Sequence, residues 1–209
     1  MCGVDSYDSV KVGFALVDYD GNSYSTVKIG NQTWMAENLR TTSYRNGNPI
    51  TNITNPNEWD GNFSLGAWAH YNNDSQNENP YGKLYNGYAI SGNVCPVGWH
   101  VPTDAEWTEL SDFLGGENVA GWKMKSIGTE YWQSPNTDAT NESGFSGLPG
   151  GNRNINGTFG SIGEGGWWWS STEYFNDYLY YRTVASWSGQ IGGSHAYKKD
   201  GYSVRCLRD

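Results

Sequence analysis

The chain has 209 residues, a net charge of −9 and a high content of aromatic residues and glycine. The acidic charge argues against nucleic acid or an anionic membrane as a partner, because both attract Lys and Arg. No apolar run is long enough to cross a bilayer as a helix, so we expect no transmembrane segment. Only 36% of the residues are hydrophobic, but 11 Trp and 15 Tyr bury enough area to form a core.

The N-terminal part is expected to contain an extension and a hairpin. Residues 1–19 show little hydrophobic pattern, which favours an N-terminal extension or an edge strand before a single domain over residues 20–209. The segments 24–29 and 32–35 flank Gly30-Asn31, a two-residue turn signal. This arrangement predicts a β-hairpin.

The middle of the chain contains the clearest helix. Thr103 and Glu106 form a capping box, which predicts a helix beginning just after Thr103, and Gly115-Gly116 is expected to end it. Its apolar face is expected to hold Trp107, Leu110, Phe113 and Leu114. A second helix is expected over residues 117–126. Its apolar contacts are expected to include Val119, Met124 and Ile127.

The remaining segments indicate loops and short strands. Residues 44–79 are dominated by Asn, Gly, Asp and Pro, which is typical of long surface loops. Short strands are expected at 68–71 and 83–86. A last strand is expected to place Val204 and Cys206 on one side, with Ser203 and Arg205 on the other. Helices and short strands of this kind predict an α+β domain.

Three cysteines allow one disulfide with one residue left over. Cys95 and Cys206 each lie inside an ordered motif, so we expect them to be bonded, which would indicate an oxidising compartment. Two buried free thiols are the alternative. Cys2 is expected to be unpaired, either as an ordinary terminal residue or as the lipid-bearing cysteine of a lipoprotein.

The segment between the tryptophan triplet 167–169 and Cys206 has the composition of an antibody binding loop. Tyr and Trp offer large amphipathic contact area, while Ser, Gly and Asn adapt their hydrogen bonds. The ligand-binding residues are therefore predicted to be Tyr174, Phe175, Asn176, Asp177, Tyr178, Tyr180, Tyr181, Ser186, Trp187, Ser188, Ser194, His195 and Tyr197. Leu179 and Val184 are expected in the core, as are Trp99, Trp107, Trp168 and Trp169. Of Tyr180 and Tyr181, one ring is expected to face inward and one outward.

Five motifs together resemble the Fibrobacter succinogenes major paralogous domain over about residues 20–209. They are Gln-Thr-Trp-Met-Ala-Glu-Asn-Leu at 32–39, Asn-Val-Cys-Pro-Val-Gly-Trp-His-Val-Pro-Thr-Asp-Ala-Glu-Trp at 93–107, Gly-Phe-Ser-Gly-Leu-Pro-Gly-Gly at 144–151, Trp-Trp-Ser-Ser-Thr-Glu-Tyr at 168–174 and Gly-Tyr-Ser-Val-Arg-Cys at 201–206.

The resemblance implies a C-type-lectin-like fold with two helices, short antiparallel strands and long irregular loops, close to the formylglycine-generating enzymes. It also implies display on the surface of Bacteroidetes or related bacteria. Some proteins of this fold are diversified near the C-terminus by retroelements. Relatives are commonly Asn-rich between the last two motifs, whereas this chain is rich in Tyr, Ser and Gly there. A variable binding surface could have this composition, and so could an ordinary irregular segment.

Chemical sites are less well supported by the sequence. Residues 72–79 offer many oxygen ligands for calcium, but they lack the spacing of a known calcium loop, and a solvated loop is the alternative. Three scattered histidines show no zinc spacing. Formylglycine-generating enzymes use two reactive cysteines in the C-terminal part, where this chain has only Cys206. We therefore expect no enzymatic activity.

Together, these expectations describe a secreted or surface-anchored receptor or adhesin without a catalytic site. Its partner is expected to be a protein or glycan on another cell or on a phage or host surface, and no cofactor is expected beyond calcium as an option. A glycan-binding module of a surface lipoprotein or fimbrial tip is the main alternative, and a structural shell domain that buries these rings between subunits is another.

Overall fold

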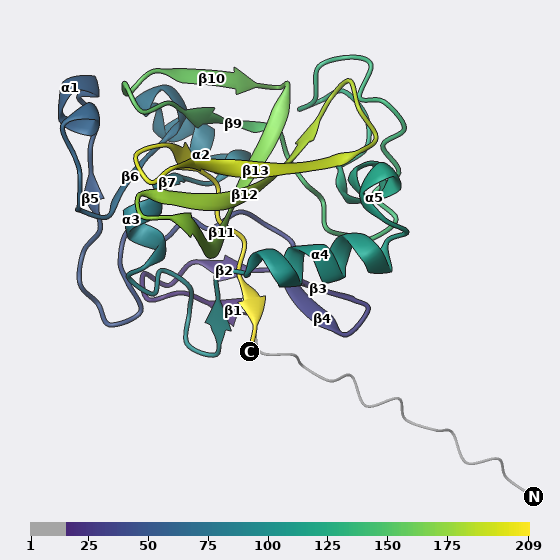
Figure 1. The fold of residues 1–209 in the computed structure, drawn as a ribbon, viewed down its shortest axis with the longest axis horizontal. Coiled ribbons are helices and arrows are strands. Elements are labelled where there is room, and N and C mark those ends of the chain that lie inside the picture. The colour runs from purple at the N-terminus through teal and green to yellow at the C-terminus, as the bar shows by residue number, and fades with distance from the viewer. Residues whose placement is uncertain (1–15) are drawn as a thin grey trace, which may run out of the picture.

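The computed structural model describes residues 16–209, which form an α+β domain (Figure 1). Its largest sheet has nine strands in the order β13-β12-β11-β9-β14-β7-β6-β5, with β10 paired to β9. These strands are β5 (Thr51–Asn52), β6 (Ala67–Ala69), β7 (Leu84–Asn86), β9 (Gly150–Arg153), β10 (Phe159–Ile162), β11 (Gly165–Phe175), β12 (Tyr178–Ala185), β13 (Ile191–Tyr197) and β14 (Gly201–Tyr202). The sheet is mixed, because β5 runs parallel to β6 and β9 parallel to β11.

A second sheet has four strands in the order β3-β4-β15-β8. They are β3 (Thr26–Ile29), β4 (Gln32–Met35), β8 (Trp99–His100) and β15 (Leu207–Arg208). The predicted hairpin is confirmed, since Ile29 pairs with Gln32 across Gly30-Asn31. A short ladder joins β1 (Leu16–Val17) to β2 (Ser23–Tyr24), so the end of the segment 1–19 does form a strand. Cys2 lies outside the described residues.

Both predicted helices are present, at α4 (Asp104–Phe113) and α5 (Glu117–Met124). Thr103 and Glu106 form the expected capping box, and Gly115 and Gly116 follow the helix with positive φ angles. Residues 16–209 also contain three helices that the sequence did not predict, because a segment of four or five residues is too short to show helical periodicity. These are α1 (Pro56–Asp60), α2 (Glu78–Tyr81) and α3 (Gly87–Ile90), beside the 3₁₀ turns Tyr71–Asn73 and Ser75–Asn77.

Two residues predicted on apolar helix faces are exposed instead. The side chain of Phe113 is 63% exposed, because it lies over Gly30 of the hairpin rather than under the helix. A Cβ atom on Gly30 would lie 2.9 Å from the Phe113 ring, so this close approach requires a glycine. Ile127 lies beyond the end of α5 and is exposed too.

The core consists of two main clusters on opposite faces of β11. Trp168 belongs to the cluster under α4 and α5, together with Trp107, while Trp169 belongs to the other cluster, together with Trp99 and the disulfide. Successive residues of a strand point to opposite faces, so adjacent tryptophans serve both clusters. The expected burial of these four rings is confirmed.

The predicted disulfide between Cys95 and Cys206 is present. The predicted last strand is only partly correct, because β14 ends at Tyr202 and β15 begins at Leu207. The four residues between them are all buried. Arg205 is fully buried, and its guanidinium donates to the carbonyls of Phe145 and Ser146 and to Asn38 Oδ1.

Candidate ligand-binding surface

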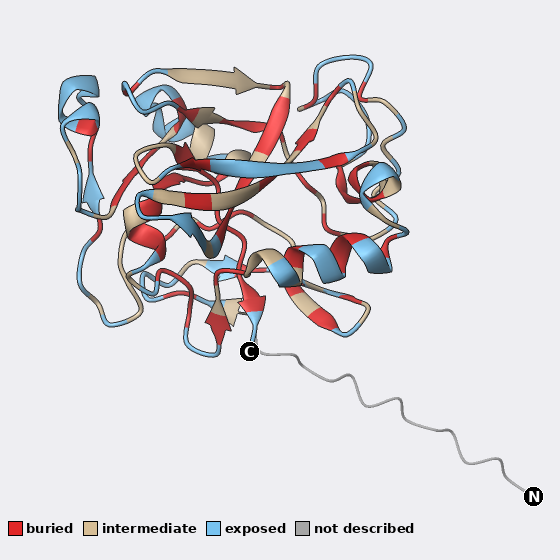
Figure 2. Ribbon diagram, viewed as in Figure 1, coloured by how far each residue is buried: buried red, intermediate tan, exposed pale blue. Residues whose placement is uncertain are grey.

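Strands β11, β12 and β13 are adjacent in the large sheet and change character along their length (Figure 2). We call residues 165–170, 182–186 and 191–193 the anchored end, where α4 and α5 cover one face. There Arg182 pairs with Asp104 at the start of α4, at 2.9 Å. We call residues 173–180 and 194–197 the open end, where β11 is exposed from Glu173 onward and β13 is exposed except at Ala196.

The pairing register explains why rings gather at the open end. Leu179 and Ala196 lie opposite each other and are buried in the core. Their neighbours therefore point to the outer face, where Tyr178 lies opposite Tyr197 and Tyr180 lies opposite His195. Tyr174 is added from β11, and we call the resulting group the aromatic cluster, comprising Tyr174, Tyr178, Tyr180, His195 and Tyr197.

The rings of the aromatic cluster contact one another. The Tyr174 ring stacks on His195 with centroids 3.9 Å apart and planes 10° apart, and it meets Tyr180 edge-on at 5.5 Å. The Tyr178 ring lies 4.1 Å from Tyr197. A hydrogen bond to Tyr197 raises the pKa of Tyr178 to about 12, so the phenol stays neutral at physiological pH. Tyr178 and Tyr180 are half-buried and the other three rings are exposed. Mutual contacts hold the rings in place, which leaves less side-chain entropy to lose on binding.

The tip of the β11–β12 hairpin is held against the body of the domain. Asn176 and Asp177 make the turn, and Asn176 adopts a φ of 35°, a conformation that Asn tolerates. The backbone N–H of Lys198 donates to the Asp177 carbonyl, and the Lys198 carbonyl accepts from Gly87 at the start of α3, each at 2.7 Å. The Lys198 ammonium also pairs with Glu173 at 2.5 Å. The turn is thereby fixed on both sides.

A pocket of about 280 Å³ adjoins the hairpin tip. It is lined by Phe63, Tyr88, Ile155, Asp177, Tyr197 and Lys199. Asp177 and Tyr197 belong to the predicted site, whereas the other four come from loops, a helix and a chain segment that no sequence motif links to it. Lys199 is close to Tyr197 in the chain, but Phe63, Tyr88 and Ile155 are far from both and reach the pocket only through folding.

Some predicted residues lie apart from the aromatic cluster. Ser186, Trp187 and Ser188 are in the β12–β13 loop, at the opposite end of these strands. Ser186 is buried, so its prediction as a ligand contact is wrong: its backbone bonds Thr137 and Glu164 and holds the loop in place. Trp187 is 62% exposed and Ser188 is half-buried, with its carbonyl accepting a hydrogen bond from the buried Lys125 ammonium.

The remaining predicted residues divide between surface and core. Phe175, Asn176, Asp177 and Ser194 are exposed. Tyr181 is half-buried on the face opposite the aromatic cluster, with its ring 5.2 Å from that of Tyr202. Between Tyr180 and Tyr181, it is therefore Tyr181 that faces inward.

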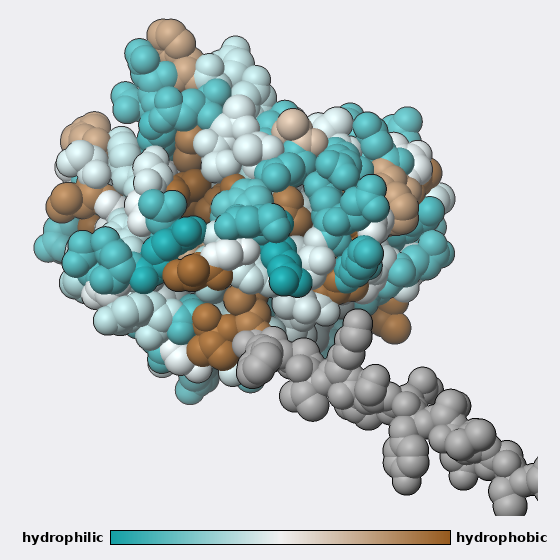
Figure 3. Space-filling model, turned by 90° about the horizontal axis from the view of Figure 1, so that it is seen from below, coloured by the Kyte–Doolittle hydropathy of each residue, from teal (hydrophilic) through white to brown (hydrophobic). Residues whose placement is uncertain are grey.

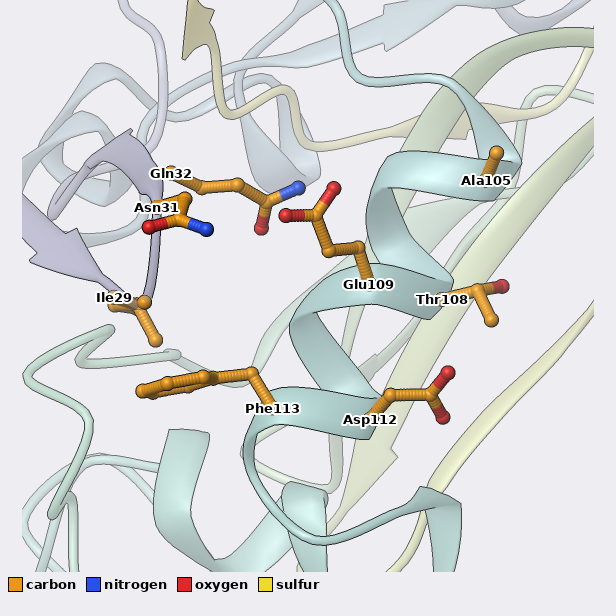
Figure 4. Close-up of a pocket in the computed structure, with 9 residues that line it drawn as sticks. Ile29, Asn31, Gln32, Ala105, Thr108, Glu109, Asp112 and Phe113 are labelled. Carbon is orange, nitrogen blue, oxygen red and sulfur yellow. The ribbon is translucent and has the colours of Figure 1, made fainter.

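A separate groove lies between the β3–β4 hairpin and α4 (Figure 4). Glu109 and Phe113 point toward Gln32 and the hairpin, whereas Asp112 points away (Figure 4). The two carboxylates do not converge, so this groove lacks a paired acid and base. Elsewhere, one face of the molecule shows hydrophobic residues in small groups among hydrophilic ones (Figure 3). Such scattered apolar residues are ordinary for a protein surface.

The polar residues that suggested calcium bind the protein itself. Asp74 accepts a hydrogen bond from the Gln76 backbone N–H, and Asn77 donates to the Tyr71 carbonyl. Glu78 contacts both Lys83 and His70. Within residues 16–209, no three His, Cys, Asp or Glu side chains form a group that could hold a metal ion. The same residues include no helix long and apolar enough to cross a membrane.

Fold and surface together define a disulfide-bonded α+β domain with an exposed aromatic cluster on its largest sheet. The family model of the Fibrobacter succinogenes major domain matches residues 27–208, so the chain belongs to that family. No curated protein and no solved structure shows significant similarity to the chain.

Proposed function

We propose that this chain is a ligand-binding domain without enzymatic activity, of the receptor or adhesin type, whose binding surface is the aromatic cluster. The observation that carries this proposal is the set of mutually packed rings at the open end, of which Tyr174, His195 and Tyr197 are exposed and the other two half-buried. Hot spots of protein interfaces are enriched in Tyr, and rings that are already ordered lose little entropy on binding. The Cys95–Cys206 disulfide supports a secreted or surface location.

A protein ligand fits the ring geometry better than a glycan does. A sugar ring stacks best on an open aromatic face, and neighbouring coplanar rings extend such a platform. Here one face of Tyr174 is covered by His195, and Tyr174 and Tyr180 are nearly perpendicular, at 88°. Glycan binding is the alternative, and the test must distinguish it from protein binding.

We also propose that residues 20–209 have the C-type-lectin-like fold implied by the family motifs, and that retroelement-driven variation is confined to residues 174–197. The exposed members of this segment do not hold the core together, so substitutions there would be tolerated. Variation confined to these positions in sister genes, beside a reverse transcriptase and a template repeat, would support this proposal. Invariant tyrosines in all sister genes would contradict it.

The test is a binding screen of the immobilised domain against purified extracellular proteins and a glycan array. For any ligand found, the double variant Tyr174→Ala/Tyr180→Ala is expected to weaken binding at least tenfold. The matched control is Trp187→Ala, which removes an exposed ring outside the aromatic cluster. Binding that survives the double variant but is lost in the control would overturn the proposed surface.

A further inference from the structure

The pocket beside the hairpin tip combines aromatic walls with an acidic group. Phe63, Tyr88 and Tyr197 provide three rings, and Ile155 adds an aliphatic wall. Phe63 is 68% exposed and Tyr197 is 44% exposed, so each ring keeps accessible surface although Lys199 lies over Phe63 and Tyr178 packs on Tyr197. An apolar wall of this kind binds the hydrocarbon part of a side chain.

The charges around the pocket leave it acidic. Lys199 lines the wall, but its ammonium pairs with Asp60 at 2.7 Å and lies over the Phe63 ring at 4.4 Å. The Lys198 ammonium is likewise paired with Glu173. Asp177 is exposed and forms no ion pair with any residue from 16 to 209. Two neutralised lysines and one free carboxylate give the pocket a net negative charge.

Two further observations place negative charge at this pocket. Burial, followed by the charge of Asp177, raises the pKa of Tyr88, which shows that the carboxylate acts on a ring of the pocket wall. Asp200 lies behind the wall, against the backbone of Ile155 and Tyr197, and burial raises its pKa to about 6. Asp200 is therefore ionised at neutral pH and adds a second negative charge.

We propose that this pocket binds a cationic side chain, preferably arginine, from a basic segment of a protein partner. A guanidinium stacks on tyrosine faces and takes two hydrogen bonds to a carboxylate, while its stem lies on apolar walls. The net charge of −9 favours encounter with such a basic segment. This inference deepens the proposed function, since Tyr197 belongs to both the pocket and the aromatic cluster.

The test uses N-acetyl-arginine amide as the probe, titrated into the domain while the ring signals of Tyr88 and Tyr197 are followed by NMR. The expected result is saturable binding that shifts these two rings and weakens as salt is raised. N-acetyl-norleucine amide, which has an apolar stem without the charge, and N-acetyl-glutamate amide are the ligand controls. Equal binding of the norleucine compound would overturn the proposal and define a purely apolar subsite.

Variants test whether the Asp177 carboxylate binds the arginine probe. Asp177→Asn is expected to weaken arginine binding about fivefold, the loss of one partly exposed charge-assisted pair. The matched control Asp112→Asn removes an exposed carboxylate from the separate α4 groove and is expected to change nothing. An unchanged thermal midpoint for both variants confirms that they fold. Equal affinity of Asp177→Asn and the wild-type chain would refute the inference.

The probe experiment needs no macromolecular ligand, so the two proposals can fail separately. If arginine does not bind, but Tyr174→Ala/Tyr180→Ala abolishes binding of a protein ligand, only the pocket inference fails. If arginine binds and no ligand depends on the aromatic cluster, only the proposed function fails.

Discussion

The anchored end and the open end of β11, β12 and β13 share one hydrogen-bonded ladder but differ in what covers them. At the anchored end, Trp168 and Trp169 are both fully buried, because helices lie on one face and the disulfide-bonded cluster lies on the other. At the open end, one face still packs through Leu179, while the opposite face carries exposed rings. A single set of strands therefore supports both a rigid core and an accessible surface.

The difference teaches that the face to which a side chain points, and not the strand that carries it, separates structural residues from displayed ones, since Tyr180 and Tyr181 are both half-buried. Tyr180 and Tyr181 are adjacent and similar, yet one belongs to the aromatic cluster and the other packs on Tyr202. Substitutions at the anchored end should therefore mainly lower stability, whereas substitutions at the open end should mainly weaken binding.

Removing the disulfide should cause the largest loss of stability. The bond closes a loop with a sequence separation of 111 residues, and chain entropy gives about 4–5 kcal/mol for a loop of this length. The double variant Cys95→Ala/Cys206→Ala is expected to lose this much stability in urea unfolding. A loss below about 1 kcal/mol would show that the core holds the anchored end without the bond.

Removing single rings tests the two ends directly. Trp169→Ala is expected to lower the unfolding free energy by about 3–5 kcal/mol, because the ring is fully buried and its Nε1 donates to the Tyr85 carbonyl at 2.7 Å. Tyr174→Ala, in the same strand, is expected to lose about 1 kcal/mol, mainly from its ring contacts. Similar losses of unfolding free energy for the two variants, measured in urea, would show that the two ends contribute equally to stability.

Two glycines probe how tightly the strands are covered. A Cβ atom on Gly166 would lie 2.5 Å from both the Leu148 carbonyl and the Trp168 ring, so Gly166→Ala should cost about 1–3 kcal/mol. Gly192 is an exposed position of the edge strand β13, and a Cβ atom on it would lie 3.2 Å from a Thr183 methyl group, so Gly192→Ala should change stability by less than about 0.5 kcal/mol. Thermal melts of the two variants compare them.

The stability of the chain should also depend on pH through Asp200. Burial raises its pKa from 3.8 to about 6, so the folded chain holds this proton more tightly than the unfolded chain does. The contribution is present below the unfolded value and is lost as the pH rises from about 4 to about 6. Relative to Asp200→Asn, the wild-type chain should therefore lose stability over this interval, as measured by urea midpoints. A constant difference between the two proteins would disprove the assignment.

Local signals in the sequence predicted the parts of the fold that depend on neighbouring residues. The Gly30-Asn31 turn and the capping box of Thr103 and Glu106 are made within a few residues, so each can be recognised from the chain alone. The cysteine pair was recognised from its motifs. In contrast, alternation placed Arg205 on the opposite side of the chain from Val204 and Cys206, but it says nothing about what packs on each side, so the burial of Arg205 was not predicted.

The surface was predictable in composition but not in arrangement. Alternation placed Leu179 inside, and the aromatic-rich segment marked where exposed rings occur. It did not separate Trp187 from the aromatic cluster, since the length of β12 and β13 places the loop at their other end. The pocket was missed because Phe63, Tyr88 and Ile155 approach the hairpin only through long-range packing.

Strand β15 has a consequence for biogenesis. It lies between β4 and β8, and Leu207 pairs with both Trp34 and His100. Until the ribosome has added β15, the four-stranded sheet lacks the strand that joins β4 to β8. Until it has added Cys206, Cys95 lacks its disulfide partner. The domain can therefore mature only after synthesis has passed Cys206 and Leu207, and any nonsense mutation upstream should yield a chain that proteases remove.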